Sequence, residues 1–516
     1  MRRLVCLIAL LGGAAVLHAQ SAALPADFDA YVGRVMRAFD VPGLAIAVVR
    51  DGQVVLAKGY GVRRLGEAAP VDAHTRFGIA SNTKAFTGTA LGMLVEEGKL
   101  EWDAPVVRYL PAFALSDPYV TSQLSVRDLL VHRSGLGLGA GDLLWWPAST
   151  YNRQEIVHRL RFLPLATSFR SAYAYDNVLY SVAGLLIEAV TGKTWEQFVQ
   201  DRLLTPLGMT DATPTYAFTA NTATTHAPVE GRLTFVPPDT SANTNPAGGI
   251  LASASDMAKW MVVQLDSGRV RAGGPRLWQP RTTRALWSVV TPLSEIRPGP
   301  ELAPLRANFR GYGLGFFLQD YRGEKLVSHT GGLPGFVSKV AMLPDRKFGV
   351  AVLTNAESGA AFDAITYALL DHALGAPAHD WLGAYQRLTA AQDRQTAQAE
   401  AAAANVPEAQ RRPSLPLDTY AGTYRDPWYG DVVVERQGEG LRIRFTRTPS
   451  LVGALVPHRF DTFVARWDDR TLRADAYVSF TLSPEGTIEA VRMKAVSPAT
   501  DFSYDFHDLR LTPVRQ

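Results

Sequence analysis

The chain has 516 residues, a formal net charge of +3 at neutral pH and one cysteine. Its composition, 47% hydrophobic and 20% charged, excludes an intrinsically disordered chain, and its length predicts two or three packed domains. The small net charge, with no basic run interleaved with aromatic residues, argues against a nucleic-acid partner.

The N-terminus carries the pattern of a targeting segment. Arg2 and Arg3 precede an apolar run over residues 4–17, and Ala19 supplies a small residue for cleavage. This pattern predicts a signal peptide over residues 1–22 and a periplasmic or secreted protein, with an uncleaved anchor as the alternative. The only cysteine lies inside this segment, so the mature chain would contain no disulfide. No later run is long enough to cross a bilayer, and we expect no integral membrane span after signal removal.

Strand patterns at both ends of residues 24–378 enclose a long, mainly helical middle. After a helical pattern over residues 25–40, the apolar runs 44–49 and 54–57 flank Asp51-Gly52, which is typical of a β-hairpin. At the other end we expect three strands and a helix, over residues 325–328, 336–343, 348–353 and 360–374. This order predicts an α+β domain in which an antiparallel sheet is assembled from both ends, with helices packed on it.

The character of the chain changes after residue 378. Residues 379–412 are polar and rich in alanine and glutamine, which predicts a helical or polar linker. Over residues 413–516 the apolar period becomes two, as in Leu441, Ile443 and Phe445. This alternation predicts a small all-β domain of sandwich or barrel type.

Ser81 and Lys84 form the motif around which the first domain is organised. An apolar stretch ends at Ser81, Lys84 follows three residues later, and Leu91, Leu94 and Val95 recur at helical spacing. Both polar side chains would lie on one face at the start of a helix. A lysine amine whose pKa is lowered by burial can take the serine proton and so create a nucleophile. Because a Ser-x-x-Lys match also arises by chance about once in a chain of this size, partners elsewhere must decide.

Two later stretches could complete such a site. Tyr175 and Asn177 precede a helical pattern, where a phenol could relay a proton and an amide could hold a carbonyl. An ordinary turn and helix cap is the alternative for this stretch. The second stretch, residues 328–336, contains Thr-Gly-Gly at the end of a strand, whose open edge could receive a substrate as an added strand.

In this order the three stretches resemble the serine β-lactamase and penicillin-binding-protein superfamily. The similarity is to the class C β-lactamase-like branch, which includes D-aminopeptidases, DD-carboxypeptidases, esterases and CubicO-type peptidases. Ser81-x-x-Lys84, Tyr175-x-Asn177 and His329-Thr330-Gly331 look like its three motifs. The resemblance covers about residues 25–375 and implies a sheet with helices on both faces plus a helical subdomain. The C-terminal domain is more loosely similar to the lipocalin-like domains appended to some of these enzymes.

The resemblance implies a serine hydrolase that forms an acyl-enzyme with a peptide, amide or ester. Ser81 would be the nucleophile, while Lys84 and Tyr175 would share the proton transfers, either of them acting as the general base. No cofactor is implied, and no cluster of His, Asp or Glu has metal-ligand spacing. A small-molecule or peptide substrate is the expected partner, and the C-terminal domain could mediate oligomerisation.

Substrate binding is implied for residues of the second and third motifs. These are Asn177, His329, Thr330 and Gly331. The backbone N–H groups of Ser81 and Gly332 would form the oxyanion hole.

Two positions depart from the pattern of the antibiotic-hydrolysing members. His329 stands where those enzymes usually have lysine, and a histidine is mostly neutral at pH 7, so it would recruit a substrate carboxylate less well. This favours a D-amino-acid peptidase, carboxypeptidase or esterase; a β-lactamase and an acylable penicillin-binding sensor with negligible turnover are the alternatives. Asp176 is expected to point outward, because an inward carboxylate would keep Lys84 protonated.

Three aromatic residues near the motifs allow two interpretations each. Trp145 and Trp146 could wall an apolar pocket for the acyl group or pack within the helical subdomain. His132 is expected to order a loop rather than to act in catalysis.

Overall fold

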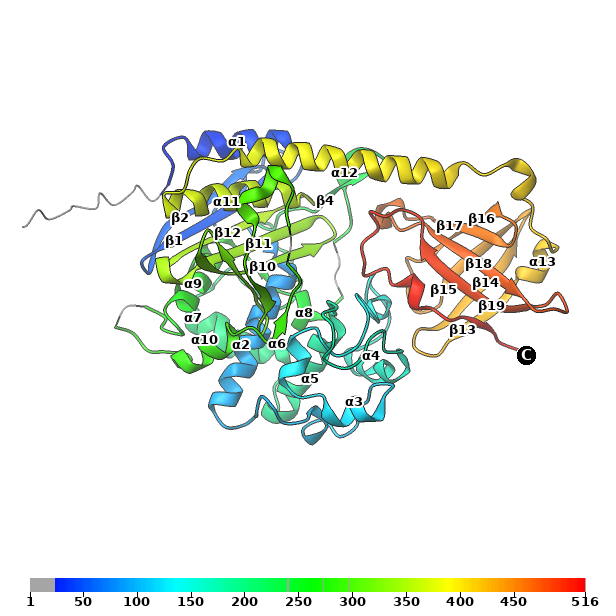
Figure 1. The fold of residues 1–516 in the computed structure, drawn as a ribbon, viewed down its shortest axis with the longest axis horizontal. Helices are drawn as coiled ribbons and strands as arrows, with labels where there is room; N and C mark the ends of the chain where they lie inside the picture. Colours follow the sequence, from blue (N-terminus) through cyan, green and yellow to red (C-terminus); the bar gives the residue numbers. More distant parts are fainter. Residues whose placement is uncertain (1–23, 239–240, 272, 296, 516) are drawn as a thin grey trace, which may run out of the picture.

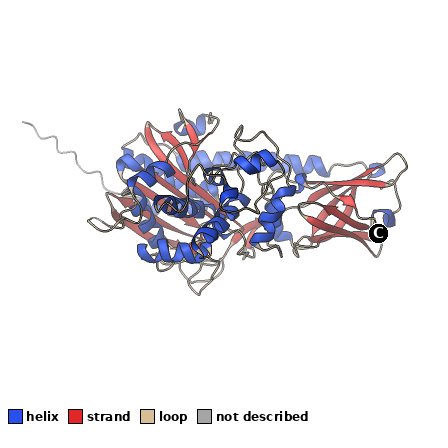
Figure 2. Ribbon diagram, turned by 90° about the horizontal axis from the view of Figure 1, so that it is seen from below, coloured by secondary structure: helices blue, strands red, loops and turns tan. Residues whose placement is uncertain are grey.

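The computed structural model describes residues 24–238, 241–271, 273–295 and 297–515. The expected signal peptide therefore lies outside the described residues. Figure 1 shows a larger body of sheet and helices, a smaller body of strands, and a long helix that runs from one to the other. In Figure 2 the strands of the two bodies form separate groups.

The larger body contains an eight-stranded sheet whose paired neighbours are all antiparallel. The strand order is β2-β1-β12-β11-β10-β9-β8-β7. Leu44 of β1 pairs with Thr354 of β12, so strands from the two ends of the domain are neighbours in one sheet, as predicted. The strands are β1 (Gly43–Arg50), β2 (Gln53–Gly61), β7 (Thr291–Pro292), β8 (Arg310–Tyr312), β9 (Phe317–Tyr321), β10 (Glu324–Leu333), β11 (Phe336–Leu343) and β12 (Phe348–Thr354).

Helices cover both faces of this sheet because its central strands are apolar on both sides. In β1, Ile46 and Val48 belong to one core, while Ala47 and Val49 belong to the other. The helices α1 (Phe28–Ala38) and α11 (Gly359–Leu374) share the first core, and α2 (Thr83–Glu96) and α9 (Ala254–Leu265) share the second. The expected α+β class is therefore confirmed.

A helical subdomain fills the region between β2 and β7. Its longest helix, α5 (Val178–Thr191), begins directly after the second motif and ends at Gly192, whose positive φ closes the helix. The other helices are α3 (Pro118–Gln123), α4 (Arg153–Arg159), α6 (Trp195–Val199), α7 (Thr205–Leu207), α8 (Asn245–Gly248) and α10 (Pro280–Leu286). Two short strand pairs, β3 (Phe77–Gly78) with β6 (Leu251–Ala252) and β4 (His226–Val229) with β5 (Arg232–Phe235), complete it.

The helix α12 (Trp381–Ala404) connects the two bodies. Its 24 residues correspond to about 36 Å at 1.5 Å per residue. Trp381 and Tyr385 at its start are buried against the sheet domain, whereas its second half carries polar and small residues. This polar segment thus forms one continuous helix, which begins in the larger domain and ends beside the smaller one (Figure 1).

The smaller body is an eight-stranded antiparallel sheet that curls into a nearly closed barrel. The order is β19-β18-β17-β16-β15-β14-β13-β20, and a bridge between Val491 and Leu511 brings the two ends together. Leu441, Ile443 and Phe445 point inward, as their period of two predicts. The strands are β13 (Gly422–Asp426), β14 (Gly430–Gln437), β15 (Gly440–Phe445), β16 (Val452–Arg459), β17 (Thr462–Trp467), β18 (Ala476–Leu482), β19 (Ile488–Ala495) and β20 (Thr512–Pro513); the short helix α13 (Leu417–Tyr420) precedes them.

The segment between β19 and β20 leaves the barrel and reaches the helical subdomain. The carboxylate of Asp505 accepts hydrogen bonds from the backbone N–H groups of Gly141, at 2.6 Å, and Leu143, at 3.0 Å. The barrel is therefore attached to the larger domain by specific buried contacts. Among the described helices, none is both long and apolar enough to cross a membrane.

Candidate active site

Ser81 lies in a single turn of 3₁₀ helix that precedes α2. This turn, Ala80–Asn82, takes the place of the regular helix start that the sequence predicts. Ala80 has a positive φ of 49°, which is a strained conformation for a residue other than glycine. Two hydrogen bonds connect this turn to Ser338 of β11. The Ser338 hydroxyl donates to the Ile79 carbonyl oxygen and accepts from the Asn82 side-chain amide, both at 2.8 Å. The nucleophile is thus held on a rigid support.

The amine of Lys84 is completely buried beside Ser81. Its Nζ lies 2.9 Å from Ser81 Oγ, 2.7 Å from Asn177 Oδ1 and 3.0 Å from the Ala247 carbonyl oxygen. The amide and carbonyl oxygens can only accept hydrogen bonds. A neutral amine has two N–H donors and one lone pair, so donating to these two oxygens leaves the lone pair for the serine hydroxyl. The geometry is that of a base poised on its nucleophile.

Burial allows the neutral form of the Lys84 amine to be populated at physiological pH. Desolvation lowers the pKa of Lys84 to about 7, and it outweighs the nearby carboxyl groups of Asp142 and Asp176, which raise it. Near pH 7 a substantial fraction of Lys84 can therefore act as a base. An ordinary exposed lysine would be almost fully protonated at this pH.

Asn177 links Lys84 to a buried carboxyl group that the sequence did not identify. Its Nδ2 donates to Asp142 Oδ2 at 2.8 Å, which fixes the amide so that Oδ1 faces Lys84. Asp142 also accepts from Trp145 Nε1 and from the hydroxyl of Ser503, each at 2.9 Å. Since Ser503 belongs to the C-terminal domain, a chain of hydrogen bonds runs from the barrel to the catalytic amine.

Tyr175 lies beside Lys84, and its phenol group stays protonated. Its ring centroid is 4.8 Å from Lys84 Nζ and 4.3 Å from the ring of His132. Burial raises the pKa of Tyr175 well above its ordinary value, and a hydrogen bond with Ser81 lowers it by less. The sequence left the base open between Lys84 and Tyr175. These surroundings favour Lys84 as the base and leave Tyr175 as a neutral phenol that can pass on a proton.

His132 and Asp176 order the loop that carries Tyr175. His132 is buried with a positive φ of 57°, and its Nδ1 accepts a hydrogen bond from the Asp176 backbone N–H at 3.2 Å. The expectation that Asp176 points outward is wrong, because its side chain is fully buried. Desolvation raises the pKa of Asp176 to about 8, so the carboxyl group is mostly protonated at pH 7 and adds little charge beside Lys84.

His329 is held by two internal hydrogen bonds. Its Nδ1 lies 2.6 Å from the Thr330 carbonyl oxygen, so this nitrogen carries the proton, and Nε2 accepts from the Tyr312 hydroxyl at 2.8 Å. Burial, with the help of Lys84, lowers the pKa of His329 to about 3. The imidazole is therefore neutral and has no free donor for a substrate carboxylate.

The glycines of the third motif have different surroundings. A Cβ at Gly331 would lie 2.2 Å from the Ile79 carbonyl oxygen, so glycine allows β10 to approach the turn that carries the nucleophile. Gly331 does not line the cavity, although substrate binding was expected of it. A Cβ at Gly332 would meet open space, and Gly332 lines the cavity together with Thr330 and Ser81. The backbone of Gly332 is therefore open to a substrate in the cavity.

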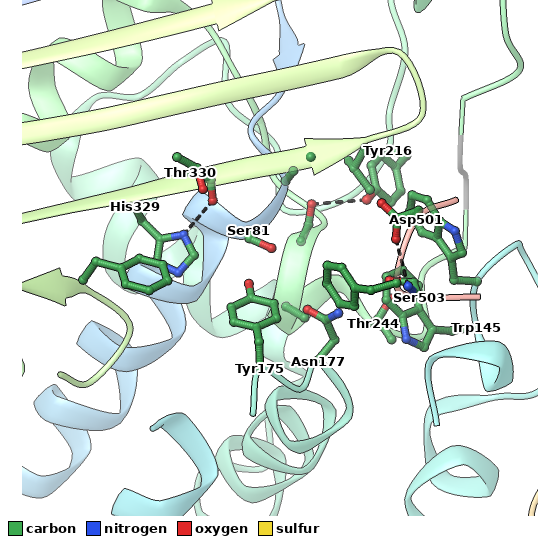
Figure 3. Close-up of a pocket in the computed structure, with 18 of the residues that line it drawn as sticks. Ser81, Trp145, Tyr175, Asn177, Tyr216, Thr244, His329, Thr330, Asp501 and Ser503 are labelled. Carbon is green, nitrogen blue, oxygen red and sulfur yellow. Dashed lines mark hydrogen bonds between the residues drawn. The ribbon is translucent and has the colours of Figure 1, made fainter. Parts of the chain in front are cut away.

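A cavity of about 340 Å³ opens above Ser81. Figure 3 shows the Ser81 and Tyr175 side chains pointing into it, with His329 at one end and Trp145, Ser503 and Asp501 at the other. Most of its large side chains are aromatic: Trp145, Trp146, Tyr173, Tyr175, Tyr216, Phe317 and Phe502. The two tryptophans therefore do wall the pocket, and Trp145 is at the same time bonded within the subdomain. Within the described residues no group of His, Cys, Asp and Glu could hold a metal ion.

The residues contributed by the C-terminal domain were missed in the sequence. Asp501, Phe502 and Ser503 line the cavity although they lie more than 400 residues after Ser81. They belong to no recognisable motif, and only the fold brings them to the site. Asp142 could have been noticed as an acidic residue in a glycine-rich stretch, but nothing in its spacing connects it with Asn177.

The first prediction concerns the identity of the base. Because only neutral Lys84 can accept the serine proton, kcat/KM should rise with pH through an apparent pKa near 7 and fall away below it. A Tyr175→Phe variant should be slower but should keep this acidic limb, which can be measured with p-nitrophenyl acetate at constant ionic strength. A limb that disappears in Tyr175→Phe would identify the tyrosine as the titrating base.

The second prediction concerns the link to the barrel. Burial raises the pKa of Asp142 to about 7, so this carboxyl group is only partly ionised near neutral pH. Ser503→Ala removes a hydrogen bond to Asp142 and should lower kcat up to about tenfold, in line with the worth of an ordinary hydrogen bond, about 1 kcal/mol. Ser497→Ala is the matched control, since the Ser497 hydroxyl contacts only the backbone N–H of Ala499 among the hydrogen bonds found for it. Equal activities of the two variants would contradict a catalytic contribution of the barrel.

Comparisons with known proteins agree with this architecture. The family model described as Beta-lactamase matches residues 28–375, and one described as a domain of unknown function (DUF3471) matches residues 406–513. The chain is 29% identical over 509 residues to unguisins hydrolase ungD of Aspergillus violaceofuscus, covering 91% of this chain and 88% of that protein.

Two solved structures share the fold at low sequence identity. The octameric penicillin-binding protein homologue from Pyrococcus abyssi is 22% identical with a TM-score of 0.58, covering 94% of this chain and 99% of that one. The D-amino acid amidase from Ochrobactrum anthropi SV3 is also 22% identical, with a TM-score of 0.54, covering 68% of this chain and 98% of that one. Because the first family model spans about two thirds of the chain, the protein belongs to the Beta-lactamase family and is a serine hydrolase of the β-lactamase and penicillin-binding-protein superfamily.

Proposed function

We propose that this protein is a periplasmic or secreted hydrolase that cleaves an amide, peptide or ester bond through an acyl-enzyme on Ser81. The observation that carries the proposal is the buried Lys84 amine, which lies 2.9 Å from Ser81 Oγ with its two N–H groups directed to other acceptors. A general base in this position typically contributes about 10²- to 10⁴-fold to the rate.

The acylation step follows from the same geometry. Ser81 Oγ attacks the substrate carbonyl carbon while its proton passes to Lys84 Nζ. The negative charge that develops on the carbonyl oxygen is stabilised by the backbone N–H groups of Ser81 and Gly332, each commonly worth about 3 kcal/mol. The carbon–nitrogen or carbon–oxygen bond then breaks, and the leaving group takes a proton relayed from Lys84 through Tyr175.

Deacylation returns the site to its starting state. A water molecule enters the open cavity, gives a proton to Lys84 and attacks the acyl carbon. Ser81 Oγ leaves with a proton, and the carboxylic acid product is released. Asn177 holds Lys84 in both steps and can also accept or donate toward a substrate amide, since it lines the cavity.

The charges around the cavity favour amides and esters over β-lactam antibiotics. His329 is neutral, both of its ring nitrogens are engaged, and the described cavity lining contains no lysine or arginine. A β-lactam carboxylate would therefore find no cation in the wall. The name of the fungal relative, a hydrolase, and the name of the structural neighbour, a D-amino acid amidase, support hydrolysis of an amide.

The third prediction tests this reaction. Ser81→Ala should reduce kcat/KM for p-nitrophenyl acetate and for D- and L-phenylalanine p-nitroanilide by at least about 10⁴-fold. Ser122→Ala, a change of an exposed serine on α3, serves as the matched control and should retain wild-type rates. Full activity of the Ser81→Ala variant would exclude the proposed mechanism.

The same preparation separates the alternatives. Rapid turnover of a chromogenic cephalosporin would assign a β-lactamase, and stable labelling by a fluorescent penicillin without turnover would assign a sensor. N-terminal sequencing of the exported protein tests the proposed location and the cleavage of residues 1–22. Mass measurement in solution tests assembly through the barrel, a possibility that the octameric homologue supports.

A further inference from the structure

A second cavity lies between the catalytic domain and the barrel. Its volume is about 430 Å³, and it shares Trp146, Gly332, Leu333 and Asp501 with the catalytic cavity. The two spaces therefore meet at these four residues. Asp501, at the junction, is contributed by the segment that the barrel extends toward Ser81.

The described walls of the two cavities carry more acidic than basic side chains. Asp501 is the one carboxylate among the described residues that line the catalytic cavity, and no lysine or arginine accompanies it there. The second cavity adds Glu357, Asp469 and Arg473. Arg473 is engaged by Glu357 through two hydrogen bonds of 2.7 and 2.8 Å. Asp501 and Asp469 are left as the excess acidic groups, and among the described residues no ion pair within 4 Å includes Asp501. Burial raises the pKa of Asp501 above its ordinary value, and a cation bound beside it would favour its charged form.

The position of Asp501 is fixed by its neighbours. Its carboxylate accepts a hydrogen bond from the backbone N–H of Ser503 at 2.9 Å, and the Ser503 hydroxyl is bonded to Asp142. Between them, the ring of Phe502 packs edge-on against Tyr175 with centroids 6.0 Å apart. Asp501 thus occupies a built position at the end of the cavity opposite His329 (Figure 3).

We propose that Asp501 binds an ammonium group on the acyl part of the substrate. The substrate class is an amide or short peptide with a free amino group next to an aromatic or apolar side chain. The carboxylate supplies a charge-assisted hydrogen bond, and the neighbouring Trp145 and Tyr216 rings offer faces that also attract a cation. This inference rests on the proposed function, because it takes Ser81 as the point at which the acyl part is attached.

The test compares free and blocked amines as ligands. Phenylalanine amide and glycyl-phenylalanine amide, each in both phenylalanine enantiomers, and their N-acetyl forms are measured as competitive inhibitors of p-nitrophenyl acetate hydrolysis. At least one free amine should bind tenfold or more tightly than its N-acetyl form. In Asp501→Asn its inhibition constant should rise about tenfold or more, while that of the N-acetyl form stays within about twofold.

The control is Asp418→Asn, which removes an exposed carboxylate elsewhere in the barrel domain and should preserve the preference for the amine. If no free amine is preferred, or if Asp501→Asn keeps the preference, the inference is overturned. Calorimetric titration of the same compounds into Ser81→Ala, with and without Asp501→Asn, measures their binding in the absence of turnover and so tests the preference for a free amine directly. If the wild-type protein hydrolyses none of these substrates and a fluorophosphonate does not label Ser81, the proposed function is refuted instead.

Discussion

The active site depends on keeping one amine neutral. Lys84 is surrounded by α5, α8 and the turn that carries Ser81, so water cannot stabilise its charged form. Its two hydrogen-bond acceptors, Asn177 and the Ala247 carbonyl, have to be held in fixed positions, because an amine with a free N–H group could turn its lone pair away from the serine. Much of the surrounding structure acts as support for this arrangement, including the strained Ala80 and the close approach of Gly331.

The same requirement gives the C-terminal domain a physical role. An asparagine amide can rotate, and it presents oxygen to Lys84 only if its nitrogen has an acceptor on the other side. Asp142 is that acceptor, and its own position is set by Trp145 within the subdomain and by Ser503 and Asp505 from the barrel. A domain that has no catalytic motif of its own is therefore connected to the catalytic amine through the buried carboxyl group of Asp142.

Much of this structure was predictable from local pattern, and the exceptions share a cause. The Ser81–Lys84 spacing, the hairpin at Asp51-Gly52 and the alternation in the barrel strands depend on neighbours in sequence, and the structure contains each of them. The orientation of Asp176 was predicted wrongly, because the charge argument assumed an ionised side chain and burial instead protonates it. The roles of Asp142 and Ser503 could not be predicted, since 361 residues separate the two and no periodicity relates them.

The distribution of charge along the cleft indicates how this chain differs from a carboxylate-binding enzyme. At one end His329 is neutral and its ring nitrogens are used internally by Thr330 and Tyr312. At the other end the barrel places a carboxylate, Asp501, and the walls between them are largely aromatic. Such a cleft offers an anionic group no lysine or arginine along its described lining. This polarity therefore depends on the histidine of the third motif and on one loop of the C-terminal domain, and it does not involve Ser81 or Lys84 directly.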